Sequence, residues 1–250
     1  LAIRLVPDAR RREETVELDS RLLATPALAL GRARDVTVQM AQCAVRALEN
    51  ALDAFTAYTP ELARSIREDE ERCDHYEDII GTYLVQLSSH SLSDGESQES
   101  TELLKTIGDF ERISDHAVNV LESAEELQSK KLSFSPAAMA EYQTLARATR
   151  RILHLSLDSF RQDDPVQAAQ VEPLEQVIDT LKEELRTRHI LRMRRGQCSI
   201  EAGFVWVDLL TDLERTSDHC SNVAGCVIDA GRHNLNLHET CLLYTSDAAD

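Results

Sequence analysis

Apolar residues recur at helical spacing along most of the chain. Between residues 32 and 55, Val36, Met40, Cys43 and Ala47 follow one another at intervals of three or four positions. This period places them on one face of a helix, whereas a half-buried strand would alternate every second residue. The pattern therefore predicts a long amphipathic helix over this stretch.

Capping residues mark where further helices begin. Thr59-Pro60, Ser135-Pro136 and Asp164-Pro165 each pair an N-capping side chain with proline at the first helical position. We expect helices over residues 61–90, 97–128, 135–160, 164–195 and 199–231. The loops between them are short, so neighbouring helices should run antiparallel.

The three-helix series occurs twice. The segment Asp109–Val120 matches Asp212–Val223, 103 residues later, and Glu70–Asp74 aligns with Glu175–Asp179, 105 residues later. A duplication of about a hundred residues corresponds to two bundle-sized units. We therefore predict an all-α fold of two tandem three-helix bundles: a first repeat over 31–130 and a second repeat over 135–232.

The two ends fall outside the repeats. Residues 1–30, with Pro7 and Pro26, are expected to form an irregular lead-in, and 233–250 a tail without a helical stripe. The last residues, 242–250, resemble translated adapter sequence, so we expect the tail to be partly non-native. The apolar start followed by Arg10–Arg12 suits the cytosolic exit of a membrane segment, with an ordinary soluble terminus as the alternative.

Paired carboxylates are the candidate chemistry of both repeats. Positions i and i+4 share a helix face, where two bare carboxylates repel each other by a few tenths of a kcal/mol, so a bound cation would offset the repulsion. The pairs lie on corresponding helices, on the shoulder of the apolar stripe, where oxygen ligands can hold a hard cation or iron in a groove between helices. They are Glu70/Asp74, Glu111/Asp115, Glu175/Asp179 and Glu214/Asp218.

A purely structural interpretation stays open. The carboxylates can be solvated, or paired with Arg72, Arg112 or Arg215 on a scaffold that binds no metal. His116 and His219 directly follow the aspartates and point about 100° further round the helix. We expect them to cap or pack against a neighbouring helix, with metal binding as the lesser alternative, and Asn119 and Asn222 to form hydrogen bonds between helices.

Composition narrows the function. The formal net charge of −17 opposes nucleic-acid binding, which needs a basic surface, and favours cations or basic partners. The six cysteines include no CxxC pair, which indicates reduced thiols. None of the histidines follows a glutamate at the Glu-x-x-His spacing of di-iron oxidases, and no phosphate-binding loop, GxSxG or HExxH motif is present. We therefore do not expect an enzyme.

The doubled Glu-Arg-x-Ser-Asp-His-x-x-Asn helix, preceded each time by a helix with a carboxylate pair, resembles the PhoU family of phosphate-responsive helical proteins. The segment Leu18–Leu30 looks like the junction after the membrane domain in bacterial sodium/phosphate cotransporters with a C-terminal PhoU-like domain. Together these matches cover about residues 18–232. The resemblance implies a PhoU-like duplicated up-down helical bundle with a regulatory role in phosphate homeostasis.

The resemblance also implies cofactors and partners. Family members hold iron or zinc clusters through such motifs, which carries over to the eight carboxylates and as a further option to Asp109 and Asp212. The main hypothesis is a regulatory domain on the cytoplasmic face of the bacterial inner membrane, bound to its own N-terminal membrane transport domain. The alternative is a free-standing adaptor acting on an ABC phosphate transporter and a sensor kinase; a homodimer is left open.

Overall fold

The computed structural model describes the backbone of residues 18–246 and the side chains of residues 18–231, and within these limits every regular element is a helix. This confirms the all-α prediction. The elements are the 3-10 helix η1 (Ser20–Ala24) and the α-helices α1 (Pro26–Thr56), α2 (Pro60–Leu87), α3 (Asp94–Lys130), α4 (Pro136–Gln162), α5 (Pro165–Ala168), α6 (Val171–Arg194) and α7 (Ile200–Ser246).

The predicted capping signals begin the helices as expected. The side chains of Thr59 and Ser135 accept hydrogen bonds from the backbone N–H groups of Leu62 and Ala138 at 3.2 Å. Asp164 caps α5 in the same way, and each of these residues is followed by proline at the first helical position. Local sequence therefore determines where these helices start.

The predicted lead-in over residues 1–30 is too long. Helix α1 already begins at Pro26, which we had expected to interrupt irregular chain. Proline at the first helical position loses no hydrogen bond, because that N–H has no partner within the helix, and the Ala and Leu residues that follow favour helix. Residues 1–17 lie outside the described residues, including the proposed membrane exit at Arg10–Arg12.

The predicted helix over residues 164–195 is divided into α5 and α6. Pro173 explains the division, because it has no N–H to donate to the carbonyl of Ala169 and its ring would clash with that carbonyl. The break at Ala169–Gln170 leaves Pro173 in the first turn of α6, where it is tolerated.

Helix α7 is longer than predicted. We expected it to end near Gly231, with a tail that is not helical, but the helix continues to Ser246. A single glycine costs about 1 kcal/mol in a helix interior, and no proline follows it in this stretch to end the helix.

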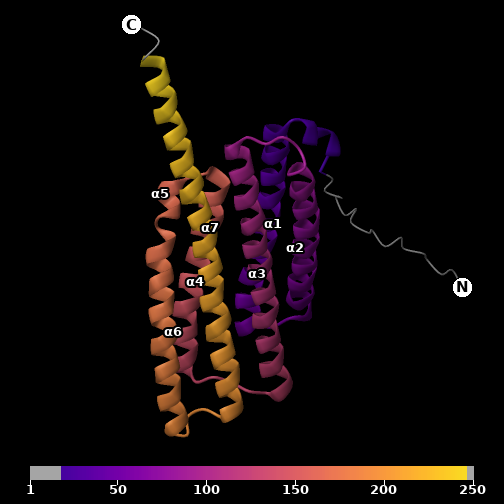
Figure 1. Ribbon diagram of the computed structural model, residues 1–250. Helices are drawn as coiled ribbons and strands as arrows, with labels where there is room; N and C mark the ends of the chain where they lie inside the picture. The colour runs from indigo at the N-terminus through magenta and orange to yellow at the C-terminus, as the bar shows by residue number, and fades with distance from the viewer. Residues whose placement is uncertain (1–17, 247–250) are drawn as a thin grey trace, which may run out of the picture.

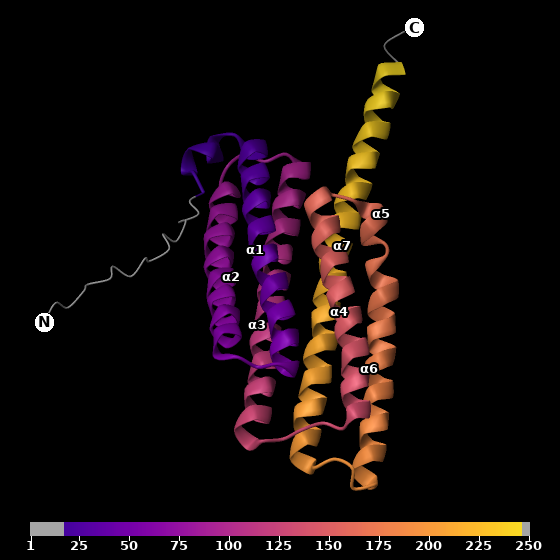
Figure 2. The same cartoon turned by 180° about the vertical axis from the view of Figure 1, so that it is seen from behind.

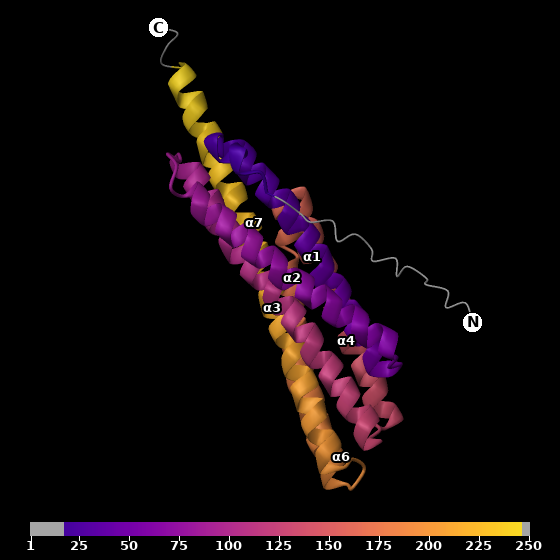
Figure 3. The ribbon, with the colours of Figure 1, turned by 90° about the vertical axis from the view of Figure 1, so that its right-hand side faces the viewer.

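Helices α3 and α7 lie side by side at the centre of one face, with α2 beside α3 and α6 beside α7 (Figure 1). Helices α1 and α4 pack together on the opposite face (Figure 2). The helices run up and down the long axis of an elongated molecule (Figure 3). The turn between α6 and α7 forms one end of this rod, and the beginning of α1 lies near the other end (Figure 1).

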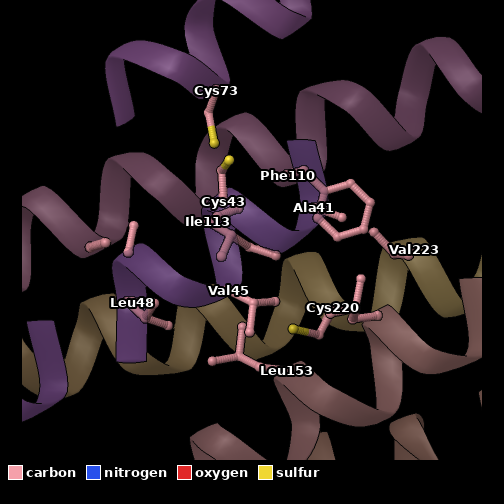
Figure 4. Close-up of a cluster of buried hydrophobic side chains, with 14 of the residues drawn as sticks. Ala41, Cys43, Val45, Leu48, Cys73, Phe110, Ile113, Leu153, Cys220 and Val223 are labelled. Atoms are coloured by element: carbon pink, nitrogen blue, oxygen red, sulfur yellow. The ribbon is translucent and has the colours of Figure 1, made fainter. Parts of the chain in front are cut away.

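One hydrophobic core joins the two repeats. Side chains from α1, α3, α4 and α7 meet at its centre, among them Val45, Phe110, Leu153 and Cys220 (Figure 4). Aromatic contacts continue the core across the repeat boundary: the rings of Phe110 and Phe160 are 5.7 Å apart. The repeats are thus packed together as one body, through the helices that face each other.

None of the described helices combines the length and the apolar character that crossing a bilayer requires.

Candidate metal centres

The first carboxylate cluster lies in the groove between α2 and α3. Oxygen atoms of Glu70, Asp74 and Asp115 all lie within 4.8 Å of one another. Glu70 and Asp74 are one turn apart on α2, and Asp115 faces them from the antiparallel α3. We call this cluster the first centre.

The second repeat forms the same cluster between α6 and α7. Oxygen atoms of Glu175, Asp179 and Asp218 lie within 4.8 Å of one another. These residues occupy the positions that Glu70, Asp74 and Asp115 hold in the first repeat. We call this cluster the second centre. Six of the eight predicted carboxylates therefore converge, three in each repeat.

The remaining two carboxylates, Glu111 and Glu214, stand one turn before Asp115 and Asp218 and are not part of the compact groups of three. Glu111 is mostly buried, and its Oε2 lies 3.3 Å from Nε of Arg112. Burial, followed by the charge of Asp115, raises the pKa of Glu111 to about 7, although Arg112 acts in the opposite direction. Glu111 thus borders the first centre and is influenced by its charge.

Glu214 has a different neighbour. Its Oε1 lies 2.7 Å from Nζ of Lys182, and both side chains are about four-fifths buried. In the first repeat, the residue at the position of Lys182 is Glu77, whose charge also raises the pKa of Glu111. A lysine in one repeat therefore replaces a glutamate in the other. Sequence reasoning missed both residues, although alignment of the two repeats at the spacing of 105 residues already reveals the exchange.

Crowding of negative charge is visible in both centres. Burial, followed by nearby carboxylates, raises the pKa of Glu70 and Asp74 in the first centre. The same causes raise the pKa of Glu175 and Asp218 in the second, where Lys182 partly opposes the shift of Asp218. Burial and the neighbouring carboxylates therefore both favour the protonated forms of these groups in each centre.

The arginines only partly explain the clusters. Nη1 of Arg112 lies 3.2 Å from Oδ2 of Asp115, so one carboxylate of the first centre has an arginine partner. Arg72 instead pairs with the buried Asp69 outside the centre. Arg215 forms no ion pair with any described residue. The interpretation in which arginines neutralise every predicted carboxylate therefore accounts for a minority of them.

The two histidines connect the repeats. Nδ1 of His116 lies 3.0 Å from Oδ1 of Asp212, and Nδ1 of His219 lies 2.8 Å from Oδ1 of Asp109. The same aspartate oxygens also accept hydrogen bonds from asparagine side chains. Asn119 donates to Asp212, and Asn222 donates to Asp109. We call this symmetric set the inter-repeat clasp. It confirms the predicted packing role of the histidines and asparagines, and it gives Asp109 and Asp212 partners outside the two centres.

The donor set fits a metal ion. Each centre offers carboxylate oxygens from two helices at mutual distances that one cation, or a small cluster, could bridge. Such oxygens suit hard divalent cations and iron, and zinc also accepts them. The charge of the centres supports the fit, because burial and the neighbouring carboxylates both raise the pKa of these groups and a bound cation would favour their ionised forms.

Comparison with known proteins agrees with this architecture. A family model described as the PhoU domain matches residues 37–124 and 142–227, one segment in each repeat. Both carboxylate centres lie within the matched segments.

Relatives of similar length match most of the chain. It is 25% identical over 182 residues to the phosphate-specific transport system accessory protein PhoU homolog 1 of Thermotoga maritima, a match covering 72% of this chain and 78% of that relative. It is 23% identical over 197 residues to the phosphate-specific transport system accessory protein PhoU homolog of Borreliella burgdorferi, covering 76% and 87%.

Solved structures share the fold. PhoU from Pseudomonas aeruginosa superposes with a TM-score of 0.68 at 22% identity, covering 85% of this chain and 97% of that one. The phosphate transport system regulatory protein PhoU from Streptococcus pneumoniae gives a TM-score of 0.73 at 17% identity, covering 82% and 96%. At these identities the likeness establishes the common helical bundle.

Proposed function

This chain belongs to the PhoU family, and from that premise we propose that it is a regulatory accessory protein of phosphate transport that binds metal ions at its two carboxylate centres. The match to nearly whole accessory proteins supports an adaptor that acts on a phosphate transport system. We infer a regulatory role rather than a catalytic one.

The observation that supports metal binding is the repetition of one three-carboxylate cluster in both repeats. Both copies keep the three carboxylates within 4.8 Å of one another, although the sequences around them differ at many other positions. When bound, a metal ion would neutralise the centres and tie α2 to α3 and α6 to α7. Glu70, Asp74 and Asp115 would hold it in the first centre, and Glu175, Asp179 and Asp218 in the second.

Metal content tests this part of the proposal. The purified chain should contain iron, zinc or manganese by mass spectrometry, and after chelation each of these metals should raise its unfolding temperature. Asp115→Asn and Asp218→Asn should each lower the metal content, and the double variant should abolish it. Glu68→Gln, an exposed carboxylate outside both centres, is the matched control. A metal-free chain whose stability does not respond to any of the three metals would refute the metal sites.

Complementation tests the regulatory part. In a bacterium lacking its own PhoU protein, the chain should restore repression of a phosphate-starvation reporter when phosphate is abundant. The Asp115→Asn/Asp218→Asn variant separates the two claims, since it tests whether regulation requires the centres. Failure of the folded, expressed wild-type chain to restore repression would count against an adaptor role in that host.

The cotransporter-domain hypothesis ranks second. It depends on the likeness of Leu18–Leu30 to a junction after a membrane domain, whereas the relatives described above are accessory proteins. Association separates the two hypotheses: an adaptor should co-purify with components of an ABC phosphate transporter, and a cotransporter domain with a sodium-dependent transport domain.

A further inference from the structure

The turn between α6 and α7 exposes large apolar side chains. Ile200 is 73% exposed and Phe204 is 67% exposed, and they lie one turn apart on the same face of α7. Ile190 and Leu191, near the end of α6, are more than two-fifths exposed. Isolated exposed apolar residues are common on protein surfaces. Among the described residues ten large apolar side chains are exposed, and these four of them lie at one end of the molecule, a concentration that suits a contact surface.

Basic side chains accompany these apolar residues. Five of the ten residues from 186 to 195 are arginine, in a chain whose net charge is −17. Arg194 and Arg195 are exposed and form no ion pair with any described residue, while Arg192 is held by Glu141 at 2.7 Å. The C-terminal end of α3 also lies towards this end of the rod (Figure 1), but its last residue, Lys130, is paired with Glu126 at 2.7 Å. We call the surface formed by Ile190, Leu191, Arg194, Arg195, Ile200 and Phe204 the basic tip.

The first repeat shows that the fold does not require this surface. Its residues at the positions of Ile200 and Phe204 are Ser97 and Thr101, and those at the positions of Arg194 and Arg195 are Ser89 and His90. The same helical hairpin thus forms without these four side chains, although Val85 keeps an exposed apolar residue at the position of Ile190. The fold of the hairpin therefore does not account for the side chains of Arg194, Arg195, Ile200 and Phe204.

We propose that the basic tip docks on an anionic lipid surface. Apolar side chains at the end of a helical hairpin can enter the boundary between headgroups and acyl chains, and the arginines can bind lipid phosphates. Four partly exposed apolar side chains offer far less than the roughly 800 Å² per partner of a stable protein interface. A fluid lipid surface instead adapts to a projecting tip and adds electrostatic attraction.

The acidic body of the molecule does not prevent this contact. Asp179 of the second centre lies 15 residues before Arg194 on α6, which corresponds to about 22 Å along the helix. The Debye length at physiological salt is about 8 Å, so the carboxylates of the second centre are largely screened from the lipid charges in an upright molecule. The arginines at the tip, in contrast, lie close enough to the lipid phosphates to interact with them. At the tip itself, Glu201 is one exposed carboxylate against the two arginines Arg194 and Arg195. The inference does not depend on metal binding.

Vesicle sedimentation tests the proposal with the full chain. It should bind vesicles of phosphatidylglycerol and phosphatidylcholine at low salt, release at high salt, and bind pure phosphatidylcholine weakly. Arg194→Glu with Arg195→Glu should weaken binding about thirtyfold, given the typical contribution of each basic residue near an anionic surface. Phe204→Asp should weaken it at least tenfold.

Matched variants give the comparison. Val85 is the counterpart of Ile190 in the first repeat and is also exposed, so Val85→Asp should leave vesicle binding unchanged. Arg151→Glu controls for the change of charge at an exposed arginine elsewhere. Fluorescence of the single tryptophan, Trp206, which is fully buried near the tip, verifies that each variant is folded. Absence of binding to anionic vesicles at low salt, or equal binding by the tip variants and the control variants, overturns the proposal. The proposal is also overturned if the basic tip binds an acidic protein but no anionic vesicles.

Discussion

At the scale of single residues, one exchange reverses a charge beside the two centres. Lys182 contacts Glu214, which borders the second centre, and the residue of the first repeat at the position of Lys182 is Glu77. Each centre has a permanent cation nearby, because Arg112 pairs with Asp115 at the first and Lys182 pairs with Glu214 beside the second. The first repeat adds the negative charge of Glu77 where the second has that lysine, so the net charge around the first centre favours a bound cation more. We therefore expect the first centre to bind metal more tightly than the second.

Lys182→Glu, which introduces the first repeat's residue, should strengthen metal binding at the second centre at least tenfold. Titration calorimetry in an Asp74→Asn/Asp115→Asn background reports this centre alone. Lys105→Glu makes the same change of charge at an exposed position outside both centres and should have little effect. Unchanged affinity in Lys182→Glu would show that the lysine does not govern the difference.

Glu111 should make the metal-free protein less stable as the pH rises. Its folded pKa is raised to about 7 from an ordinary value of 4.5, so the folded state binds more protons than the unfolded state between these values. Stability contributed by the neutral carboxyl is present below pH 4.5 and is lost as the pH passes through 7. Glu111→Gln cannot lose a proton, and with chelator present it should be more stable than the wild type at pH 8 by on the order of 1–2 kcal/mol.

Urea denaturation at pH 4.5 and pH 8 measures this difference, which should nearly vanish at the lower pH. Glu214→Gln is the comparison from the second repeat. It loses the ion pair with Lys182 and should not be stabilised at pH 8. A Glu111→Gln variant that is less stable than the wild type at pH 8 would contradict the assignment.

The sequence predicted the carboxylates of the centres better than their surroundings. Glu70, Asp74, Asp115 and their counterparts could be identified because the spacing i, i+4 and the repeat together restrict which residues share a groove. The neighbours could not, because the pairing of Lys182 with Glu214 depends on the rotation and register of α6 against α7. That geometry comes from packing between helices and is not encoded in the spacing along one helix.

At the scale of helices, a buried ion pair ties α1 to α2. Asp69 is fully buried, and its carboxylate accepts hydrogen bonds from Arg46 at 2.6 and 2.8 Å as well as from Arg72. The aligned residue in the second repeat is the partly buried Leu174. The same position is therefore filled by a charged side chain in the first repeat and by an apolar side chain in the second.

Asp69→Ala should lower the free energy of unfolding by about 2–3 kcal/mol, because it leaves a cavity and removes the partner of two arginines. Asp69→Leu, which copies the second repeat, should recover at least half of that loss, since both arginines are half exposed and can turn to water. Guanidinium denaturation of the two variants gives the comparison. A larger loss in the leucine variant would show that the ion pair cannot be replaced by packing.

Helix boundaries show how far local signals extend. Thr59 and Ser135 were sufficient to predict starts, because capping depends on residues within one turn. The role predicted for Pro26 was wrong, and the break before Pro173 was not predicted, because proline is compatible with both a break and a first turn. Which of the two applies depends on whether the flanking chain packs on the core, and the apolar residues after Pro26 do so: Ala29 and Leu30 are buried.

At the scale of the whole molecule, the two repeats share one hydrophobic core. The core continues from α1 and α3 into α4 and α7, and Tyr142 of α4 donates a hydrogen bond to the carbonyl of Leu52 in α1 at 2.6 Å. A single repeat would expose this shared face to water. The predicted division into 31–130 and 135–232 describes the internal repetition. That each part is a bundle able to fold alone stays a prediction.

Because of the inter-repeat clasp, we expect the first repeat alone to form a dimer. Asp109 and His116 on α3 have the same residue types at the same spacing as Asp212 and His219 on α7, and each aspartate pairs with the other repeat's histidine. Two antiparallel α3 helices from separate chains could therefore form both pairs with each other. A fragment of residues 18–131 should form a two-fold symmetric dimer, in which the second copy replaces the missing repeat.

Light scattering coupled to gel filtration determines the mass of this fragment. Asp109→Ala removes both aspartates of the dimer clasp at once and should weaken dimerisation at least tenfold, because each buried histidine then loses its acceptor. Glu122→Ala, an exposed position on the same helix, should leave the dimer intact. A monomeric fragment that unfolds cooperatively would show instead that α1, α2 and α3 form a sufficient core of their own, and that the clasp orients the repeats without being needed to stabilise them.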